Sequence, residues 1–156
     1  MDNGGVYMYD SREDTKQHIQ QVRVFIEKIA EAIVDRGEYH DQSKLQSPEK
    51  EIFDEYTPKL AETTYGSEEY KTRLEEMKVA LKHHYSKNRH HPEHHPNGIH
   101  DMNLVDLIEM LCDWKAATMR HNDGDIMKSI ELNQERFGYD DGIKQLMINT
   151  VKYYFE

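Results

Sequence analysis

The residues most capable of chemistry are His40-Asp41, which follow a helix stop predicted at Arg36-Gly37. An imidazole nitrogen and a carboxylate oxygen from adjacent residues can bind one divalent cation from two sides if other segments supply further ligands. Other parts of the chain offer those further ligands on predicted helices and in one loop: His18, His83, His84, the loop His90-His91-Pro92-Glu93-His94-His95, Asp106 and Asp113. One His-Asp pair is a weak signal, whereas this ordered set indicates a metal site.

Each candidate also has an ordinary structural explanation. His18 fits a capping or partly buried histidine at the edge of an apolar stripe. His84 continues the apolar stripe of the helix predicted after Ser67, while His83 points about 100° away from it. The two histidines could therefore bind two metal ions, or one metal ion and one substrate. They could equally be one core residue and one surface residue. Buried carboxylates are costly unless paired or metal-bound, and a plain salt bridge is the simple explanation for Asp106.

Residues 86–101 form a second unusual feature, because four of the ten histidines stand there in two adjacent pairs. Pro92, Pro96 and Gly98 prevent a continuous helix, so this segment is predicted to be a loop. A loop directly behind His83-His84 is well placed to cover a pocket. We therefore expect His91 and His94 to affect ligand affinity more than metal content.

The elements that must position these residues are predicted to be helices. The spacing of apolar residues predicts a first helix from Asp14 to Arg36 with one buried stripe, a short helix from Ser47-Pro48 to Thr57-Pro58, and a long helix that starts at Ser67 and includes His84. Asn103 is predicted to cap the most apolar helix, and two more helices follow at 125–137 and 140–155. The stripe of the first helix consists of Ile19, Val22, Ile26, Ile29 and Ile33.

The fold predicted from these elements is all-α, with about six helices in one bundle. The length of 156 residues suits a single domain, so we predict a flexible arm at 1–13 and a helical metal-binding domain at 14–156. The lone Cys112 excludes an intramolecular disulfide and is predicted to be buried and inert.

Composition narrows the classes of partner. The net charge of −10 disfavours long nucleic acids, which require clustered Lys and Arg, although a small anion can still approach a bound metal. A mean hydropathy of −0.95, the lack of any long apolar run and a first segment unlike a signal peptide predict a cytoplasmic protein with no membrane partner. If the chain is phage-encoded, that cytoplasm is the host's.

The order of these residues resembles that of the HD-domain metal-dependent phosphohydrolases, an all-helical superfamily. His40-Asp41-Gln42-Ser43-Lys44 resembles the family's His-Asp-x-Gly-Lys segment, with Ser43 in place of glycine. Leu111-Cys112-Asp113-Trp114-Lys115 is similar to the segment that supplies the family's late aspartate. His18 matches the opening histidine, and His83-His84 resembles the extra pair in branches with more than one metal.

A closer resemblance is to a family of phage and bacterial proteins of similar length whose function is not established. Three segments carry it: His40 to Leu45, His83 to His94, and Asp106-Leu107-Ile108-Glu109-Met110-Leu111-Cys112-Asp113-Trp114-Lys115-Ala116-Ala117. The resemblance names no substrate.

Together these resemblances imply a metal-dependent phosphohydrolase acting on a small nucleotide or cyclic nucleotide. The implied ligands of one or two ions are His18, His40, Asp41, His83, His84 and Asp113. The implied catalytic residues are Asp41, Lys44 and Asp113. The candidates for substrate contact are Lys44, Asn88, His91, His94, Lys115 and Arg120.

Nitrogen and oxygen ligands together favour Mn, Fe, Ni, Co or Zn, while Mg can still serve in a second position. Two alternatives stay open: a phage protein that sequesters a nucleotide without cleaving it, and a domain that uses metal only for stability. The oligomeric state, monomer or homodimer, is also open.

Overall fold

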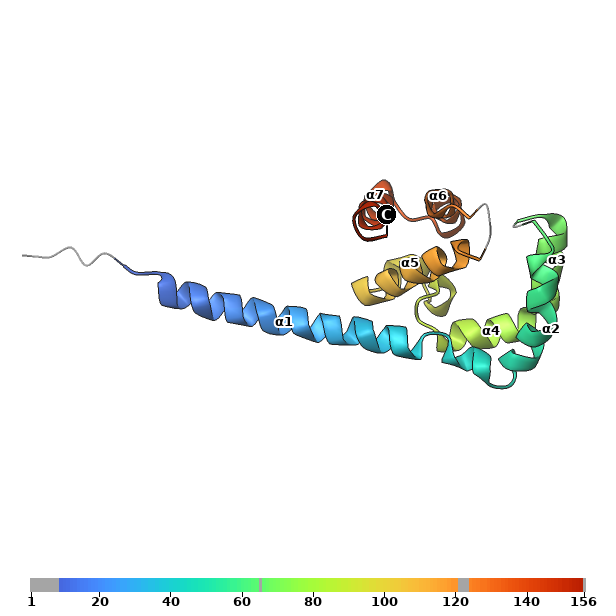
Figure 1. The fold of residues 1–156 in the computed structure, drawn as a ribbon, viewed down its shortest axis with the longest axis horizontal. Coiled ribbons are helices and arrows are strands. Elements are labelled where there is room, and N and C mark those ends of the chain that lie inside the picture. Colours follow the sequence, from blue (N-terminus) through green and yellow to red (C-terminus); the bar gives the residue numbers. More distant parts are fainter. Residues whose placement is uncertain (1–8, 65, 121–123, 156) are drawn as a thin grey trace, which may run out of the picture.

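The computed structural model describes residues 9–64, 66–120 and 124–155, and within these ranges the chain is all-helical without strands (Figure 1). This confirms the all-α prediction, with seven α-helices instead of about six. They are α1 (Arg12–Tyr39), α2 (Glu49–Ala61), α3 (Glu68–Glu76), α4 (Lys78–Lys87), α5 (Leu104–Thr118), α6 (Ile126–Phe137) and α7 (Asp141–Tyr154). Most of the predicted arm, residues 1–8, lies outside the described residues.

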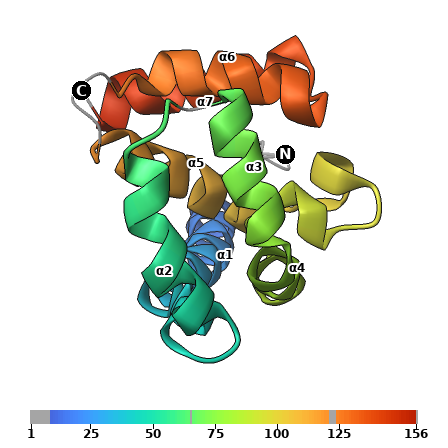
Figure 2. The same cartoon turned by 90° about the vertical axis from the view of Figure 1, so that its right-hand side faces the viewer.

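The last three helices form the main hydrophobic core. Figure 2 shows α6 and α7 side by side across α5. Buried Met110 and Leu111 of α5 meet Ile130 of α6 and Met147 of α7. The predicted cap Asn103 forms a capping box with Asp106, and Asp125 and Asp140 cap α6 and α7 by accepting bonds from their first turns.

The helix α1 differs from its prediction in two ways. It continues through Gly37 to Tyr39, because one glycine costs a helix only about 1 kcal/mol and Arg36 fixes the last turn by ion pairs to Asp106 and Glu109. The apolar stripe predicted to be buried is largely exposed, and α1 contains no buried residue. Figure 1 shows the reason: only the C-terminal end of α1 lies against the other helices.

Two predicted helix ends also move. The helix α2 passes through Pro58 and ends at Ala61. The loss of one backbone donor at Pro58 is tolerated there, since α2 packs against α3 and α4. The single long helix predicted after Ser67 is divided at Met77, whose ψ of 2° interrupts the helical turn between α3 and α4 while its side chain is buried.

The prediction that Cys112 is buried is wrong, because it faces outward from α5. No helix within the described ranges is both long enough and apolar enough to cross a bilayer.

Asp106 ties the end of α1 to α5 and to the histidine-rich segment. It is fully buried and accepts bonds from Arg36 at 2.7 Å and from Arg89 at 3.0 and 3.2 Å. The simple explanation of Asp106 as a salt-bridge residue therefore agrees with its contacts.

Replacing Asp106 with alanine leaves two guanidinium groups without their shared buried partner. We expect the Asp106→Ala variant to lose about 3 kcal/mol of unfolding free energy in urea titrations, as for other broken buried ion pairs. Asp54→Ala, which removes an exposed ion pair with Lys50, serves as the control and should cost less than about 1 kcal/mol. Equal losses in both variants would contradict this account of Asp106.

Candidate metal centre

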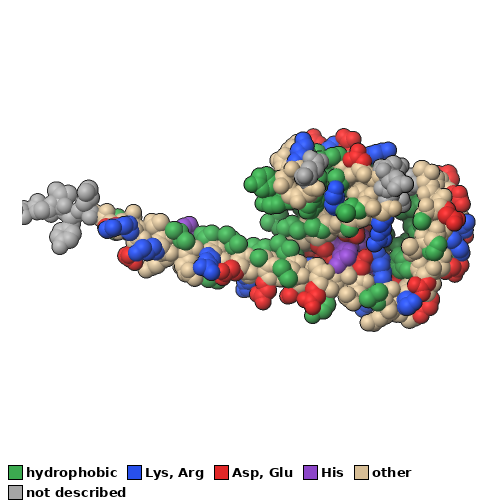
Figure 3. All heavy atoms as spheres, in the orientation of Figure 1, with side chains coloured by type: hydrophobic (Ala, Val, Ile, Leu, Met, Phe, Trp, Pro, Cys, Tyr) green, Lys and Arg blue, Asp and Glu red, His purple; other side chains and the backbone are tan. Residues whose placement is uncertain are grey.

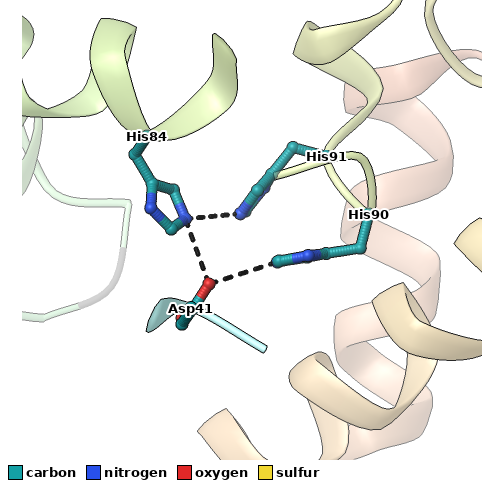
Figure 4. A group of neighbouring side chains, drawn as sticks. All are labelled: Asp41, His84, His90 and His91. Atoms are coloured by element: carbon teal, nitrogen blue, oxygen red, sulfur yellow. Dashed lines mark hydrogen bonds and ion pairs between the residues drawn. The ribbon is translucent and has the colours of Figure 1, made fainter. Parts of the chain in front are cut away.

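Four side chains from three segments converge on one point. Asp41 follows α1, His84 lies on α4, and His90 and His91 lie in the loop after α4. One ligand atom from each lies within 4.8 Å of those of the other three. Figure 4 shows the three imidazoles and the carboxylate turned toward one another.

Asp41 reaches this point through an uncommon backbone conformation. Its φ of 55° and ψ of 17° lie in the left-handed region, which aspartate tolerates better than most residues. The chain turns there from α1 into the short 3-10 helix η1 (Gln42–Leu45). Lys44 of that turn donates to Asp41 Oδ2 at 2.6 Å, which leaves Oδ1 toward the histidines.

Glu49 orients the histidines of α4. This buried carboxylate lies 2.8 Å from His84 Nδ1 and 2.6 Å from His83 Nδ1, and it also accepts a bond from Ser43. An Nδ1–H that donates to a carboxylate directs the opposite lone pair, on Nε2, toward a metal. His84 Nε2 indeed lies 3.3 Å from Asp41 Oδ1.

Glu109 of α5 holds two further histidines in the same manner. Its Oε1 lies 3.0 Å from His40 Nδ1 in a hydrogen bond. The same oxygen lies 3.0 Å from His90 Nδ1 as an ion-pair contact without hydrogen-bond alignment. Both Nε2 atoms consequently lie on the side of Asp41 and Asp113.

His40, His90 and Asp113 form a second group of suitable ligand atoms. His40 Nε2 lies 3.5 Å from Asp113 Oδ1, and His90 Nε2 lies 4.0 Å from Asp113 Oδ2. Because His90 belongs to both groups, the two positions adjoin each other. The six side chains can therefore bind one ion, which some of them would coordinate, or two neighbouring ions, only one of which His90 Nε2 can coordinate.

The charge states of His84 and His91 permit them to bind a cation. Burial, aided by Lys44, lowers the pKa of His84 below its usual value, and burial together with His90 and His84 lowers the pKa of His91 to about 3. Both imidazoles are thus neutral at pH 7, and their Nε2 atoms lie 2.9 Å apart. With its proton on Nε2, neutral His91 donates a hydrogen bond to His84 Nε2; with its proton on Nδ1, both Nε2 lone pairs are available to one cation.

In the second group the pKa of one histidine is raised instead of lowered. Hydrogen bonds to Asp113 and Glu109 raise the pKa of His40 to about 10. Burial alone would raise the pKa of Asp113, but the bond to His40 holds it below its usual value. In the metal-free protein His40 is therefore protonated, and this proton must leave before Nε2 can bind a metal.

Two buried atoms support the presence of an ion most directly. Asp41 Oδ1 and His90 Nε2 have no hydrogen-bond partner among the described residues, and a buried polar atom without a partner is costly. They lie 3.6 Å apart, which is close to the separation of two ligands on one ion. Their donor set of imidazole nitrogens and carboxylate oxygens fits first-row transition metals or zinc.

Two cavities adjoin the centre. One, of about 330 Å³, lies between α1 and α5, is mainly apolar, and includes His40 and Asp113 in its wall. The other, of about 170 Å³, is lined by Arg36, Lys87 and Arg89 and by Glu109. A ligand thus has both an apolar and a cationic surface within reach of the histidines.

The structure brings together four of the predicted metal ligands: His40, Asp41, His84 and Asp113. It does not bring His18 to them, because the 22 residues from His18 to His40 follow one helix and span roughly 33 Å. His83 contacts Glu49 instead of either ligand group.

Some of the predicted substrate residues also lie at the centre and others do not. Lys44 lies at the centre, and His91 joins the ligand group itself, although it was expected to contact substrate. Asn88 donates to Ser43 Oγ and to the His84 carbonyl, and His94 Nδ1 lies 2.8 Å from the Tyr85 carbonyl. The last two predicted substrate residues are half-buried Lys115 and exposed Arg120. Among the described residues, no contact links either of them to the two groups of ligand atoms.

Sequence reasoning named the loop that contains His90 as a source of ligands without choosing His90, and it gave no role at the site to Glu49 or Glu109. Glu109 had a usable signal, because it precedes Asp113 by one helical turn and so shares its face of α5. Only the fold of the loop decides which histidine of His90-His91-Pro92-Glu93-His94-His95 turns inward, and no local pattern pairs Glu49 with His84.

Comparison with known proteins places the chain in a family. The model of a family of unknown function, DUF5662, matches residues 8–153, and the chain therefore belongs to that family. No curated protein and no solved structure matches it.

The first prediction for this centre concerns metal content. Asp41→Ala and His90→Ala each remove a converging atom that lacks another partner, so elemental analysis should find at least a tenfold lower metal content at unchanged helix content. The control is His94→Ala, which alters a histidine of the same loop outside both groups and should retain the metal. Full metal content in Asp41→Ala and His90→Ala would exclude this site.

The second prediction concerns pH. Since the pKa of His40 is about 10 in the folded protein and near 6.5 in the unfolded chain, its stabilisation is complete below pH 6.5 and is lost as pH rises toward 10. The melting temperature of metal-free protein should fall across this window, and that of His40→Gln should change less. Parallel curves for the two proteins would contradict the shift.

Proposed function

We propose that this member of the DUF5662 family is a metal-dependent phosphohydrolase that acts on a small phosphorylated molecule of the nucleotide or cyclic nucleotide class. The observation that carries the proposal is the orientation of His84 and His40. Glu49 and Glu109 hold their Nδ1 atoms, so that their Nε2 atoms point to Asp41 and Asp113.

A divalent ion at this point would supply Lewis-acid chemistry, by acidifying a water molecule and polarising a phosphoryl oxygen. Asp41, His84, His90 and His91 would hold one ion, and His40 and Asp113 extend the ligand set toward the apolar cavity. The mixed nitrogen and oxygen donors favour Mn, Fe, Ni, Co or Zn, with Mg as an option in the position nearer Asp113.

Asp113 is the residue best suited to accept a proton from water. Its side chain is 28% exposed, against 0% for Glu49 and 9% for Glu109. It lines the 330 Å³ cavity, and its lowered pKa keeps it ionised at neutral pH. A substrate in this cavity would therefore meet an ionised carboxylate beside the metal ligands.

Phosphate oxygens would find positive charge on two sides. Lys44 lies beside Asp41 with a side chain that is 35% exposed. Arg36, Lys87 and Arg89 line the second cavity, although Asp106 and Glu109 already neutralise part of their charge. These cations would neutralise charge on a bound phosphate.

Sequestration of a nucleotide without cleavage is the second candidate. One observation favours it: Glu49, Glu109, Asp41 and Asp113 each already contact a histidine or Lys44, and Asp113, the candidate general base, lies 3.5 Å from His40 Nε2. A protein of this kind would bind the same class of ligand and release no phosphate.

Turnover separates the two functions. We expect untagged protein with one equivalent of Mn, Ni or Zn to release phosphate from, or linearise, at least one member of a panel of nucleotides and cyclic dinucleotides. Asp113→Asn should lower kcat about 100-fold or more by loss of a general base, while the ion held by the four-residue group remains. Asp101→Asn, an exposed substitution on η3 (Gly98–Asp101), is the matched control.

Binding of a nucleotide without turnover would contradict the hydrolase proposal. If stoichiometrically loaded protein binds a nucleotide in calorimetry but converts none of the panel, the hydrolase proposal fails and sequestration takes its place.

A further inference from the structure

Most of α1 extends away from the other described helices (Figure 1). Every residue from Tyr9 to Glu31 is exposed, including Ile19 at 60%, Phe25 at 65% and Ile26 at 61%. In Figure 3 hydrophobic side chains continue along the upper edge of this helix toward the helical body. A helix of this kind gains most of its stability from packing of its apolar face.

The spacing of the face is that of a helix-pairing surface. Ile19, Val22, Ile26, Ile29 and Ile33 follow one another at intervals of three, four, three and four residues, the pattern that keeps one stripe against a second helix. Ala30 and Ala32 lie beside this stripe and permit close approach of a second backbone. The stripe therefore fits a helix better than a flat surface.

Its area fits an interface between proteins. Ile19, Val22, Phe25, Ile26 and Ile29 are 41–65% exposed and lie within three turns of one helix. A contiguous apolar surface on a monomer rarely exceeds a few hundred Å² unless it binds a partner. A stable interface buries about 800 Å² per partner, for which the whole free length of α1 is available.

The stripe also continues into the candidate site. Ile33, its last member, lines the apolar cavity of about 330 Å³ together with Val105 and Ile108 of α5, and His40 and Asp113 complete its wall. Whatever covers the stripe therefore reaches the edge of the metal centre.

We propose that a second copy of this chain covers the face, with the two α1 helices antiparallel about a two-fold axis near Ile26. This register sets Ile19 of one copy against Ile33 of the other, and every apolar position of the stripe then meets the partner's stripe. A symmetric pair satisfies an identical exposed face on both copies at once.

Charge favours the antiparallel direction. Residues 12–25 of α1 contain three basic and two acidic side chains, and residues 26–39 contain four acidic and two basic ones. Antiparallel pairing sets the half with a net charge of +1 against the partner's half with a net charge of −2. Parallel pairing would set Lys16 beside the other Lys16 and Arg23 beside the other Arg23.

The dimer completes the site geometrically. The N-terminal half of each α1 lies over the groove between the partner's α1 and α5, and so forms the outer wall of the cavity that contains His40 and Asp113. This inference is independent of the proposed function, since it depends only on the exposed stripe and the groove.

Molecular mass by sedimentation equilibrium tests the pairing. The full chain of 18.6 kDa should sediment with twice that mass at about 10 µM, and Ile26→Glu should shift the dissociation constant at least 100-fold, toward the monomer. Val24→Glu is the matched control: it adds the same charge in place of an exposed β-branched residue on the opposite face, and should remain dimeric. Ile19→Glu is a second disruptive variant if Ile26→Glu loses helix content.

A monomer at 100 µM, or a dimer that Ile26→Glu and Ile19→Glu leave intact, would overturn the proposal. Cysteine cross-linking in a Cys112→Ser background tests the direction. The double variant Ile19→Cys/Ile33→Cys should form disulfides between positions 19 and 33 of different copies. Disulfides of Ile19→Cys alone with itself would show a parallel pair and would overturn the antiparallel arrangement.

Discussion

The candidate centre depends on two carboxylates that do not belong to either ligand group. Glu49 and Glu109 fix the imidazoles of His84 and His40 by their Nδ1 atoms, and this single constraint decides where the Nε2 lone pairs point. Beside these histidines Asp41 Oδ1 and His90 Nε2 are buried without a hydrogen-bond partner among the described residues, which is costly unless an ion or another group binds them. The rest of the fold holds these two glutamates in place.

That support comes from distant parts of the chain. Glu49 lies in the first turn of α2, close to η1, while Glu109 lies on α5 and also binds Arg36 at the end of α1. Asp106, one turn before Glu109, binds Arg36 and Arg89 and so secures the start of the histidine loop. Three segments that are remote in sequence thereby deliver one ligand or more each to a common point. The core of α5, α6 and α7 gives α5 the rigidity that this arrangement requires.

Sequence alone predicted the helical class, the caps at Ser67 and Asn103, and the proximity of His40, Asp41, His84 and Asp113, because local periodicity, capping chemistry and the order of the motifs carry these features. It failed where tertiary structure decides. The stripe of α1 has the spacing of a buried helix face, yet among the described residues only its last member, Ile33, approaches another helix, α5. His18 lies on that free part, and a continuous helix excludes it from the centre. His90 and His91 are adjacent to other histidines in the loop, so only the path of the loop shows which of them turn inward.

The account is tested most directly by anomalous diffraction from crystals of the protein loaded with one equivalent of nickel or zinc. It predicts a single strong anomalous peak at about 2.0–2.2 Å from Asp41 Oδ1 and from the Nε2 atoms of His84, His90 and His91, with Glu49 still bonded to His84 Nδ1. A second, weaker peak beside His40 and Asp113 would extend the centre to two ions. A peak only at exposed histidines such as His18 or His100, with Asp41 Oδ1 still without a partner, would contradict it.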